Sequence, residues 1–243
     1  METGLVKTTS ITAAPAALPR PRGTVRAVGL FSSVTSRQAD VAIPLASAGI
    51  LQAPASFHGM DRGGRHAEYL LVIYPGGELE EKLLGEQKQF SDDYSVTVRN
   101  KPHITVAAFQ AGEVMEETLI RWIERICTHY HSFDLTLNNY SGFPPHTIYL
   151  RVQDPQPFRH LMQQLHSIDE FIRSSGCPPV NLISRPYLSI AYGLTEQVYN
   201  RAMPDYSRRT FHDTFHVREL VLLKRTHAFD PCKTVNIFRL RAE

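Results

Sequence analysis

Long apolar runs and cysteine are both scarce in this sequence of 243 residues. No apolar stretch approaches the roughly 18 residues that a membrane span needs, so we expect no association with a membrane. The three cysteines, Cys127, Cys177 and Cys232, form no Cys-x-x-Cys or Cys/His spacing. This pattern argues against a zinc site or a disulfide framework. Because scattered thiols fit a reducing compartment, we predict a cytoplasmic protein.

The chain also lacks a strong net charge of either sign. It has 26 Lys and Arg residues against 24 Asp and Glu residues, a formal net charge of +2. Seven of the basic residues and only three of the acidic ones lie in residues 1–65, so the remainder is slightly acidic. No broad basic surface for duplex DNA is therefore expected, and any contact with nucleic acid must be local.

Residues 1–65 contain only two of the aromatic residues, Phe31 and Phe57, and show no sustained hydrophobic period. A segment of this composition cannot bury enough apolar surface to offset the entropy lost on ordering. We predict a disordered extension over 1–65 and a folded domain over 66–243. The Arg- and Ser-rich, acid-poor composition of the extension also fits an organellar transit peptide, and this alternative stays open.

From residue 66 onward the hydrophobic pattern predicts an α+β fold with antiparallel sheets. The only tryptophan, Trp122, lies on a predicted helix and is expected to pack in the core, with stacking on a nucleobase as the alternative. The polar segment 198–211 is predicted to be a loop. Strands are expected at 69–74, 103–109, 133–137, 147–152, 187–192, 217–224 and 234–240, and helices at 78–90, 116–130 and 158–172.

Two segments of seven residues repeat one another. Residues 101–107 read Lys-Pro-His-Ile-Thr-Val-Ala and residues 185–191 read Arg-Pro-Tyr-Leu-Ser-Ile-Ala. Both have the order basic, proline, ring, aliphatic, hydroxyl, β-branched, alanine. This agreement predicts an internal duplication into two half-domains.

Side chains on a strand alternate between its two faces. His103 and Thr105 therefore share one face of the first segment, and Tyr187 and Ser189 share one face of the second. Each half would present a ring beside a hydroxyl, and a pseudo-symmetric arrangement would place the two pairs across a cleft.

The order of predicted elements, with Pro102-His103-x-Thr105-Val106 and Pro186-Tyr187-x-Ser189-Ile190, resembles the 2H phosphoesterase superfamily over residues 66–241. This superfamily includes bacterial 2′-5′ RNA ligases and cyclic nucleotide phosphodiesterases. The resemblance implies two pseudo-symmetric lobes with helices packed outside and a cleft between them. It also implies a protein that needs no metal and acts on a nucleotide or RNA end with a 2′,3′-cyclic phosphate or a 2′-5′ linkage. We expect no cofactor and a monomer, although the sequence does not reveal the oligomeric state.

Carried over to this sequence, the resemblance assigns His103 as a catalytic acid or base and Thr105 and Ser189 as phosphate-binding donors. The family has histidine where this chain has Tyr187. A phenol with a reference pKa of about 10 is a poor proton shuttle at neutral pH, although it can donate a hydrogen bond to phosphate or act as a weak acid. His146 and His227 are the two candidates to replace the missing imidazole.

Three hypotheses follow from these observations. The first is a phosphodiesterase or RNA ligase-like enzyme that uses His103 and Tyr187, with activity reduced by the tyrosine. The second is a non-catalytic protein that binds nucleotides or RNA ends at a degenerate site. The third is an interaction module in which the repeat only packs the halves together, and it requires both rings to be buried.

Overall fold

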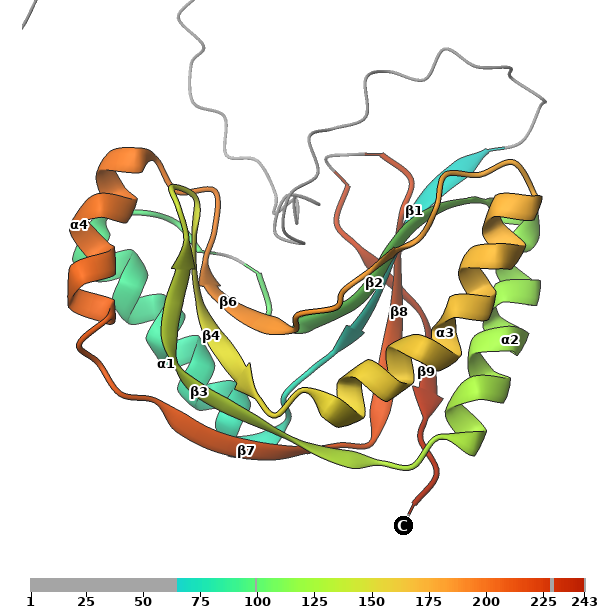
Figure 1. The fold of residues 1–243 in the computed structure, drawn as a ribbon. Helices are drawn as coiled ribbons and strands as arrows, with labels where there is room; N and C mark the ends of the chain where they lie inside the picture. The colour runs from blue at the N-terminus through green and yellow to red at the C-terminus, as the bar shows by residue number, and fades with distance from the viewer. Residues whose placement is uncertain (1–64, 99, 228–229, 243) are drawn as a thin grey trace, which may run out of the picture. The chain divides into compact units, whose positions relative to one another are not determined.

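The chain is described by a computed structural model over residues 65–98, 100–227 and 230–242. The predicted extension lies outside these residues, except for Arg65. The described part contains four α-helices, nine strands and one short 3-10 helix (Figure 1). Their bounds are β1 His66–Ile73, α1 Gly77–Tyr94, β2 Ile104–Gly112, η2 Glu113–Met115, α2 Glu116–His129, β3 Phe133–Phe143, β4 Thr147–Gln153, α3 Gln156–Ser174, β5 Asn181–Leu182, β6 Tyr187–Ala191, α4 Glu196–Tyr206, β7 His212–Val217, β8 Glu219–Arg225 and β9 Lys233–Arg239.

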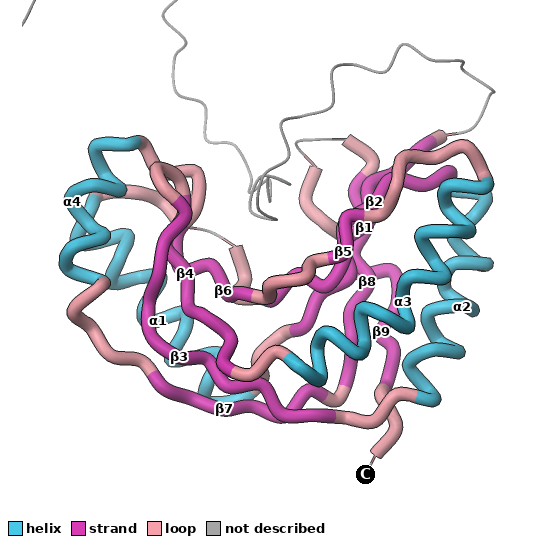
Figure 2. Tube along the Cα trace, viewed as in Figure 1, coloured by secondary structure: helices cyan, strands magenta, loops and turns pink. Residues whose placement is uncertain are grey.

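The nine strands form one curled antiparallel sheet rather than two separate ones. Its order is β7-β3-β4-β6-β2-β1-β8-β9, with the short β5 paired to β2 (Figure 2). The predicted α+β class with antiparallel strands is confirmed. The halves meet where β2 pairs with β6, and the register of this pairing consists of Ile104 opposite Leu188.

Helices cover the outer side of both halves. Helices α1 and α4 lie against the half formed by β6, β4, β3 and β7, whereas α2 and α3 lie together on the side of the β1, β2, β8 and β9 half (Figure 1). Helix α1 follows β1 in sequence yet packs on the opposite half: Phe90 of α1 contacts the Tyr206 ring of α4 at 5.3 Å, and Glu86 accepts a hydrogen bond from Tyr140 of β3 at 2.7 Å. The two halves are therefore interlocked through their helices.

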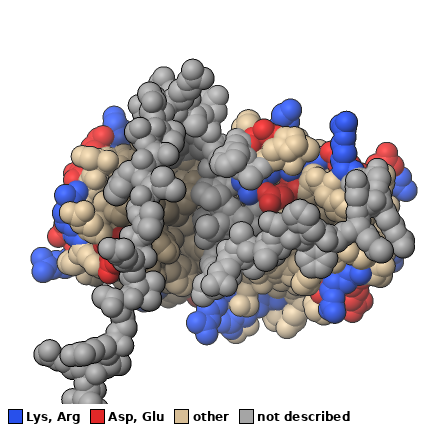
Figure 3. All heavy atoms as spheres, turned by 90° about the horizontal axis from the view of Figure 1, so that it is seen from above, with Lys and Arg blue, Asp and Glu red and all other residues tan. Residues whose placement is uncertain are grey.

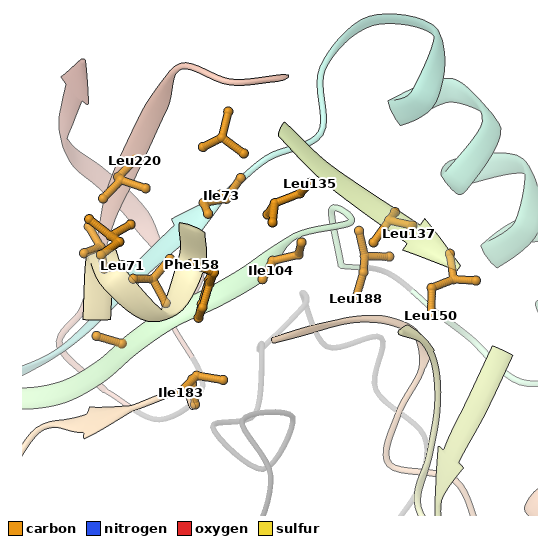
Figure 4. Packing of buried hydrophobic residues seen from close by; sticks show 14 of the residues in the cluster. Leu71, Ile73, Ile104, Leu135, Leu137, Leu150, Phe158, Ile183, Leu188 and Leu220 are labelled. Carbon is orange, nitrogen blue, oxygen red and sulfur yellow. The ribbon is translucent and has the colours of Figure 1, made fainter. Parts of the chain in front are cut away.

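The main hydrophobic core lies between the sheet and these helices. Ile104 and Leu188, the aliphatic residues of the two repeats, are both fully buried in it (Figure 4). On β1, Leu71 and Ile73 belong to the same core, while Leu70 and Val72 belong to a smaller cluster on the other face. Burial of both faces explains why residues 69–74 are continuously apolar.

The loop predicted over residues 198–211 is wrong, because much of this segment forms helix α4. The Thr195 hydroxyl caps it by accepting a hydrogen bond from the Val198 amide at 3.3 Å. Tyr199, Ala202 and Tyr206 form its buried face. This helical spacing was obscured by polar neighbours and by Pro204, which sits in the last turn.

Trp122 is not a core residue, so that prediction is also wrong. Its side chain is 40% exposed on α2, and its ring contacts Phe171 of α3 with centroids 4.9 Å apart. The buried stripe of α2 is Leu119, Ile123 and Cys127, and Trp122 lies beside this stripe. Its place on the outer helical layer separates it from the sheet face that carries the repeat residues.

The interlocking role of α1 can be tested with Phe90→Ala. Phe90 is fully buried against Tyr94 and Tyr206, so we expect a loss of about 3–5 kcal/mol in the free energy of unfolding. Leu84→Ala on the same helix is the matched control, because Leu84 is 44% exposed, and it should cost about 1 kcal/mol or less. Urea denaturation measures both, and equal losses would contradict the described packing of α1.

Candidate functional site

The pairing of β2 with β6 brings the two repeats together. Because the strands are antiparallel with Ile104 opposite Leu188, one further step in each direction places His103 beside Ser189 and Thr105 beside Tyr187. All four side chains lie on the face opposite the buried aliphatic pair. Directly opposed side chains are about 5 Å apart at Cβ, and the diagonal pair His103 and Tyr187 is about 7–8 Å apart.

His103 is held in one orientation just before β2. Its Nδ1 donates a hydrogen bond to the Lys101 carbonyl at 2.8 Å, so the proton sits on Nδ1 and Nε2 carries the free lone pair. The ring of Tyr74 packs edge-on against the imidazole at 6.1 Å. Lys101 is itself fixed by an ion pair with Glu80 at 3.0 Å and lies 4.5 Å from the Tyr74 ring centroid.

Burial also sets the charge of His103. Only 7% of the residue is exposed, and desolvation lowers the pKa of the imidazole below its usual 6.5, with the Lys101 carbonyl acting weakly in the other direction. The neutral ring is thus favoured near pH 7. A neutral imidazole with Nε2 free is suited to accept a proton.

Thr105 and Ser189 place two hydroxyl groups in this part of the sheet. Thr105 is partly exposed and Ser189 is buried. The backbone of β6 is anchored at this point from behind, because Gln87 of α1 donates a hydrogen bond to the Ser189 carbonyl at 3.4 Å. The helix that crosses from the other half therefore supports one of the two candidate phosphate donors.

Tyr187 begins β6 and has a different environment from its counterpart. It is partly exposed, and its ring contacts Tyr149 at 5.0 Å and Phe143 at 5.1 Å. The interaction-module hypothesis requires both rings to be buried, and Tyr187 does not meet that condition. The two halves of the repeat therefore differ in surroundings as well as in sequence.

Two residues that the sequence did not point to, Tyr149 and Arg151, also lie at the site. Strand β4 pairs with β6 so that Tyr149 lies opposite Ser189 and Arg151 lies opposite Tyr187. Arg151 is exposed, and within the described residues no hydrogen bond, ion pair or ring contact engages it. Alternation along 147–152 does place Tyr149 and Arg151 on one face, but the sequence does not reveal that β4 neighbours β6.

The candidate replacements for the missing imidazole lie elsewhere. The Nδ1 of His146 donates a hydrogen bond to the Leu194 carbonyl at 3.1 Å. Leu194 follows the C-terminal end of β6, whereas Tyr187 is at its N-terminal end. His227 is exposed and follows β8, which pairs with β1 and β9 rather than with either repeat strand. Neither histidine lies beside Tyr187 in the sheet.

On the face drawn in Figure 3, the visible Lys and Arg side chains are interspersed with Asp and Glu side chains. Among the described residues no group of three or more His, Cys, Asp or Glu side chains comes together in a way that could hold a metal ion.

None of the helices in residues 65–242 that the structure describes is long and apolar enough to cross a membrane.

Comparison with known proteins gives a family-level match. The family model of the 2′-5′ RNA ligase superfamily matches residues 78–228. A candidate phosphoesterase of Bacillus cytotoxicus is 27% identical over 99 residues, and one of Geobacillus thermodenitrificans is 26% identical over 103 residues. These alignments cover 40% and 41% of this chain and span only 56% and 58% of the relatives' own lengths.

Solved structures share the fold. Escherichia coli LigT complexed with 3′-AMP has a TM-score of 0.55 and 18% identity, with 72% of this chain and 98% of LigT covered. A Thermus thermophilus protein has a TM-score of 0.53 and 14% identity, with 72% and 99% covered.

The burial of His103 predicts a pH effect on stability. The pKa of His103 is lowered in the folded protein, so the unfolded chain binds the proton more readily. The free energy of unfolding therefore keeps its full value above about pH 6.5 and falls as the pH drops below it. Relative to His103→Asn, the wild-type protein should lose unfolding free energy between pH 7.5 and pH 5.5 in urea denaturation. If the wild type and His103→Asn lost the same unfolding free energy over this range, the lowered pKa of His103 would be contradicted. An NMR titration midpoint of the His103 imidazole at or above 6.5 would contradict it too.

Proposed function

Because the chain belongs to the 2′-5′ RNA ligase superfamily, whose members are 2H phosphoesterases, we propose that it acts on the 2′,3′-cyclic phosphate or 2′-5′ linkage of a nucleotide or RNA end. The observation that carries this proposal is the register of β2 against β6, which gathers His103, Thr105, Tyr187 and Ser189 on one face. An oriented neutral imidazole and two hydroxyl donors are what such a reaction needs.

In hydrolysis of the cyclic phosphate, a water oxygen bonds to phosphorus and one phosphorus–ribose oxygen bond breaks. The Nε2 of His103 takes the proton from the attacking water. The hydroxyls of Thr105 and Ser189 donate hydrogen bonds to the non-bridging oxygens, where negative charge builds up. The released ribose oxygen takes a proton from the phenol of Tyr187 or from water.

Tyr187 limits this scheme. A phenol with an ordinary pKa of about 10 gives up its proton less readily than an imidazolium, and loss of one efficient acid–base partner costs about 10²- to 10⁴-fold in rate. Arg151, opposite Tyr187, supplies a positive charge toward the phosphate from the same half. We therefore propose an enzyme whose rate is reduced by Tyr187. We also propose that it needs neither metal nor cofactor and works as a monomer in the cytoplasm.

A non-catalytic binder of nucleotides or RNA ends is the second candidate. The specific observation that favours it is the packing of the Tyr187 ring among Phe143 and Tyr149, an environment that suits a contact residue more than a proton shuttle. This alternative predicts measurable affinity without turnover, weakened by Thr105→Val or Ser189→Ala.

The enzymatic proposal is tested with His103→Ala. Purified full-length protein is incubated with a 2′,3′-cyclic nucleotide and with a short RNA that ends in a cyclic phosphate. We expect the variant to lose about 10²- to 10⁴-fold in rate, because the base is removed. His129→Ala is the matched control, since this histidine is exposed on α2, and its rate should equal that of the wild type. Absence of turnover in the wild type, or equal rates in wild type and His103→Ala, would refute the enzymatic reading.

Tyr187→His separates the two candidates further. Restoring an imidazole in the second repeat should raise the rate by up to about 10²-fold if the rest of the site is competent, with Tyr187→Phe as the control that removes only the hydroxyl. A gain from an inactive wild type would favour the binder that has lost its chemistry. A variant as inert as the wild type would indicate that the site has changed more widely.

A further inference from the structure

Phe143 is an exposed aromatic residue beside the candidate site. Its side chain is 40% exposed. Among the described residues, the other exposed large hydrophobic residues are Leu84, Val114, Trp122 and Ile237. The Phe143 ring meets the Tyr187 ring edge-on, with centroids 5.1 Å apart.

The orientation of Phe143 is fixed by its surroundings. Its ring stacks on Tyr149 with centroids 4.4 Å apart and planes 24° apart. The turn that follows is tied down, because the Phe143 carbonyl accepts a hydrogen bond from the His146 amide at 2.9 Å and the His146 carbonyl accepts one from the Leu194 amide at 3.0 Å. One face of Phe143 is thus braced, and the ring is preorganised for a partner on its exposed side.

The neighbouring glycine shows how tightly this hairpin is seated. A Cβ atom at Gly142 would lie 2.3 Å from the Tyr199 hydroxyl and 2.9 Å from the Met203 sulfur, both on α4. A larger residue at this position would require the Tyr199 and Met203 side chains to shift. The end of β3, next to Phe143, therefore packs closely against α4.

The platform is next to the candidate phosphate donors. Tyr149, on which Phe143 stacks, lies directly opposite Ser189 in the sheet. A nucleotide carries its base one ribose away from its 2′- or 3′-phosphate. A phosphate held by Ser189 and Thr105 can therefore place the attached base over the β3–β4 hairpin.

We propose that Phe143, braced by Tyr149 and Tyr187, is the stacking platform for the nucleobase of the terminal nucleotide. This inference rests on the proposed function, because it assumes that the phosphate binds at the repeat residues. Every nucleobase offers a π-face, so the platform binds purines and pyrimidines alike. The Tyr187 ring, in edge contact with Phe143, then also helps to position this platform.

The experiment compares a ligand that has a base with one that lacks it. Isothermal titration measures the Kd of adenosine 3′-monophosphate and of inorganic phosphate for the wild type and for Phe143→Ala. Stacking on one aromatic ring makes the nucleotide bind about 5- to 150-fold more tightly. We expect Phe143→Ala to lose that factor for the nucleotide and to leave the Kd of inorganic phosphate unchanged.

A fluorescent variant provides a second readout. With Trp122→Phe removing the native tryptophan, Phe143→Trp keeps an aromatic platform and should retain the wild-type affinity, with emission that changes when the nucleotide stacks on it. Ile237→Trp in the same background is the matched control, because Ile237 is 49% exposed on the distant strand β9, and its emission should stay constant.

The outcomes separate this inference from the proposed function. If inorganic phosphate and the nucleotide bind the wild type equally well and Phe143→Ala changes neither Kd, the platform is wrong and the phosphate site stands. Unchanged emission of Phe143→Trp at saturating nucleotide also overturns the platform. If neither ligand binds the wild type, the proposed function itself fails, and the platform fails with it.

Discussion

The antiparallel contact between Ile104 and Leu188 is the constraint on which the rest of the structure depends. It joins the two halves of the sheet, and it buries both aliphatic side chains in the core. Because neighbouring residues on a strand face opposite sides, the same contact turns His103, Thr105, Tyr187 and Ser189 to the other face. The same strand pairing therefore both buries the aliphatic pair and brings the residues of the candidate site together.

The two halves of that site are specialised by their surroundings. His103 is buried, fixed by the Lys101 carbonyl and kept neutral by desolvation, which are properties of a base. Tyr187 is partly exposed and belongs to an aromatic cluster with Phe143 and Tyr149, which are properties of a contact surface. We propose that the His103 half supplies the base, and that the Tyr187 half contacts the ligand, with the phenol or water returning the proton. The duplication suggested by the repeated segments stays a prediction.

The sequence predicted the elements whose hydrophobic period is strong, such as α2 and the repeat strands, and with them the fold class. It failed at α4, where Pro204 and polar neighbours hid the spacing of the buried residues. It also could not show that α1 packs on the opposite half, or that Arg151 and Tyr149 lie beside Tyr187 and Ser189, because strand neighbours depend on long-range pairing. The four repeat residues were found because two similar segments drew attention to the same positions.

The central claim is that the paired repeats form one phosphate site. A crystal structure of the full-length protein with adenosine 3′-monophosphate tests it most directly. The account predicts that the phosphate lies within hydrogen-bonding distance of the Thr105 and Ser189 hydroxyls, with the Nε2 of His103 facing the phosphorus. Density for the nucleotide elsewhere on the protein, with these hydroxyls making no contact to it, would contradict the account.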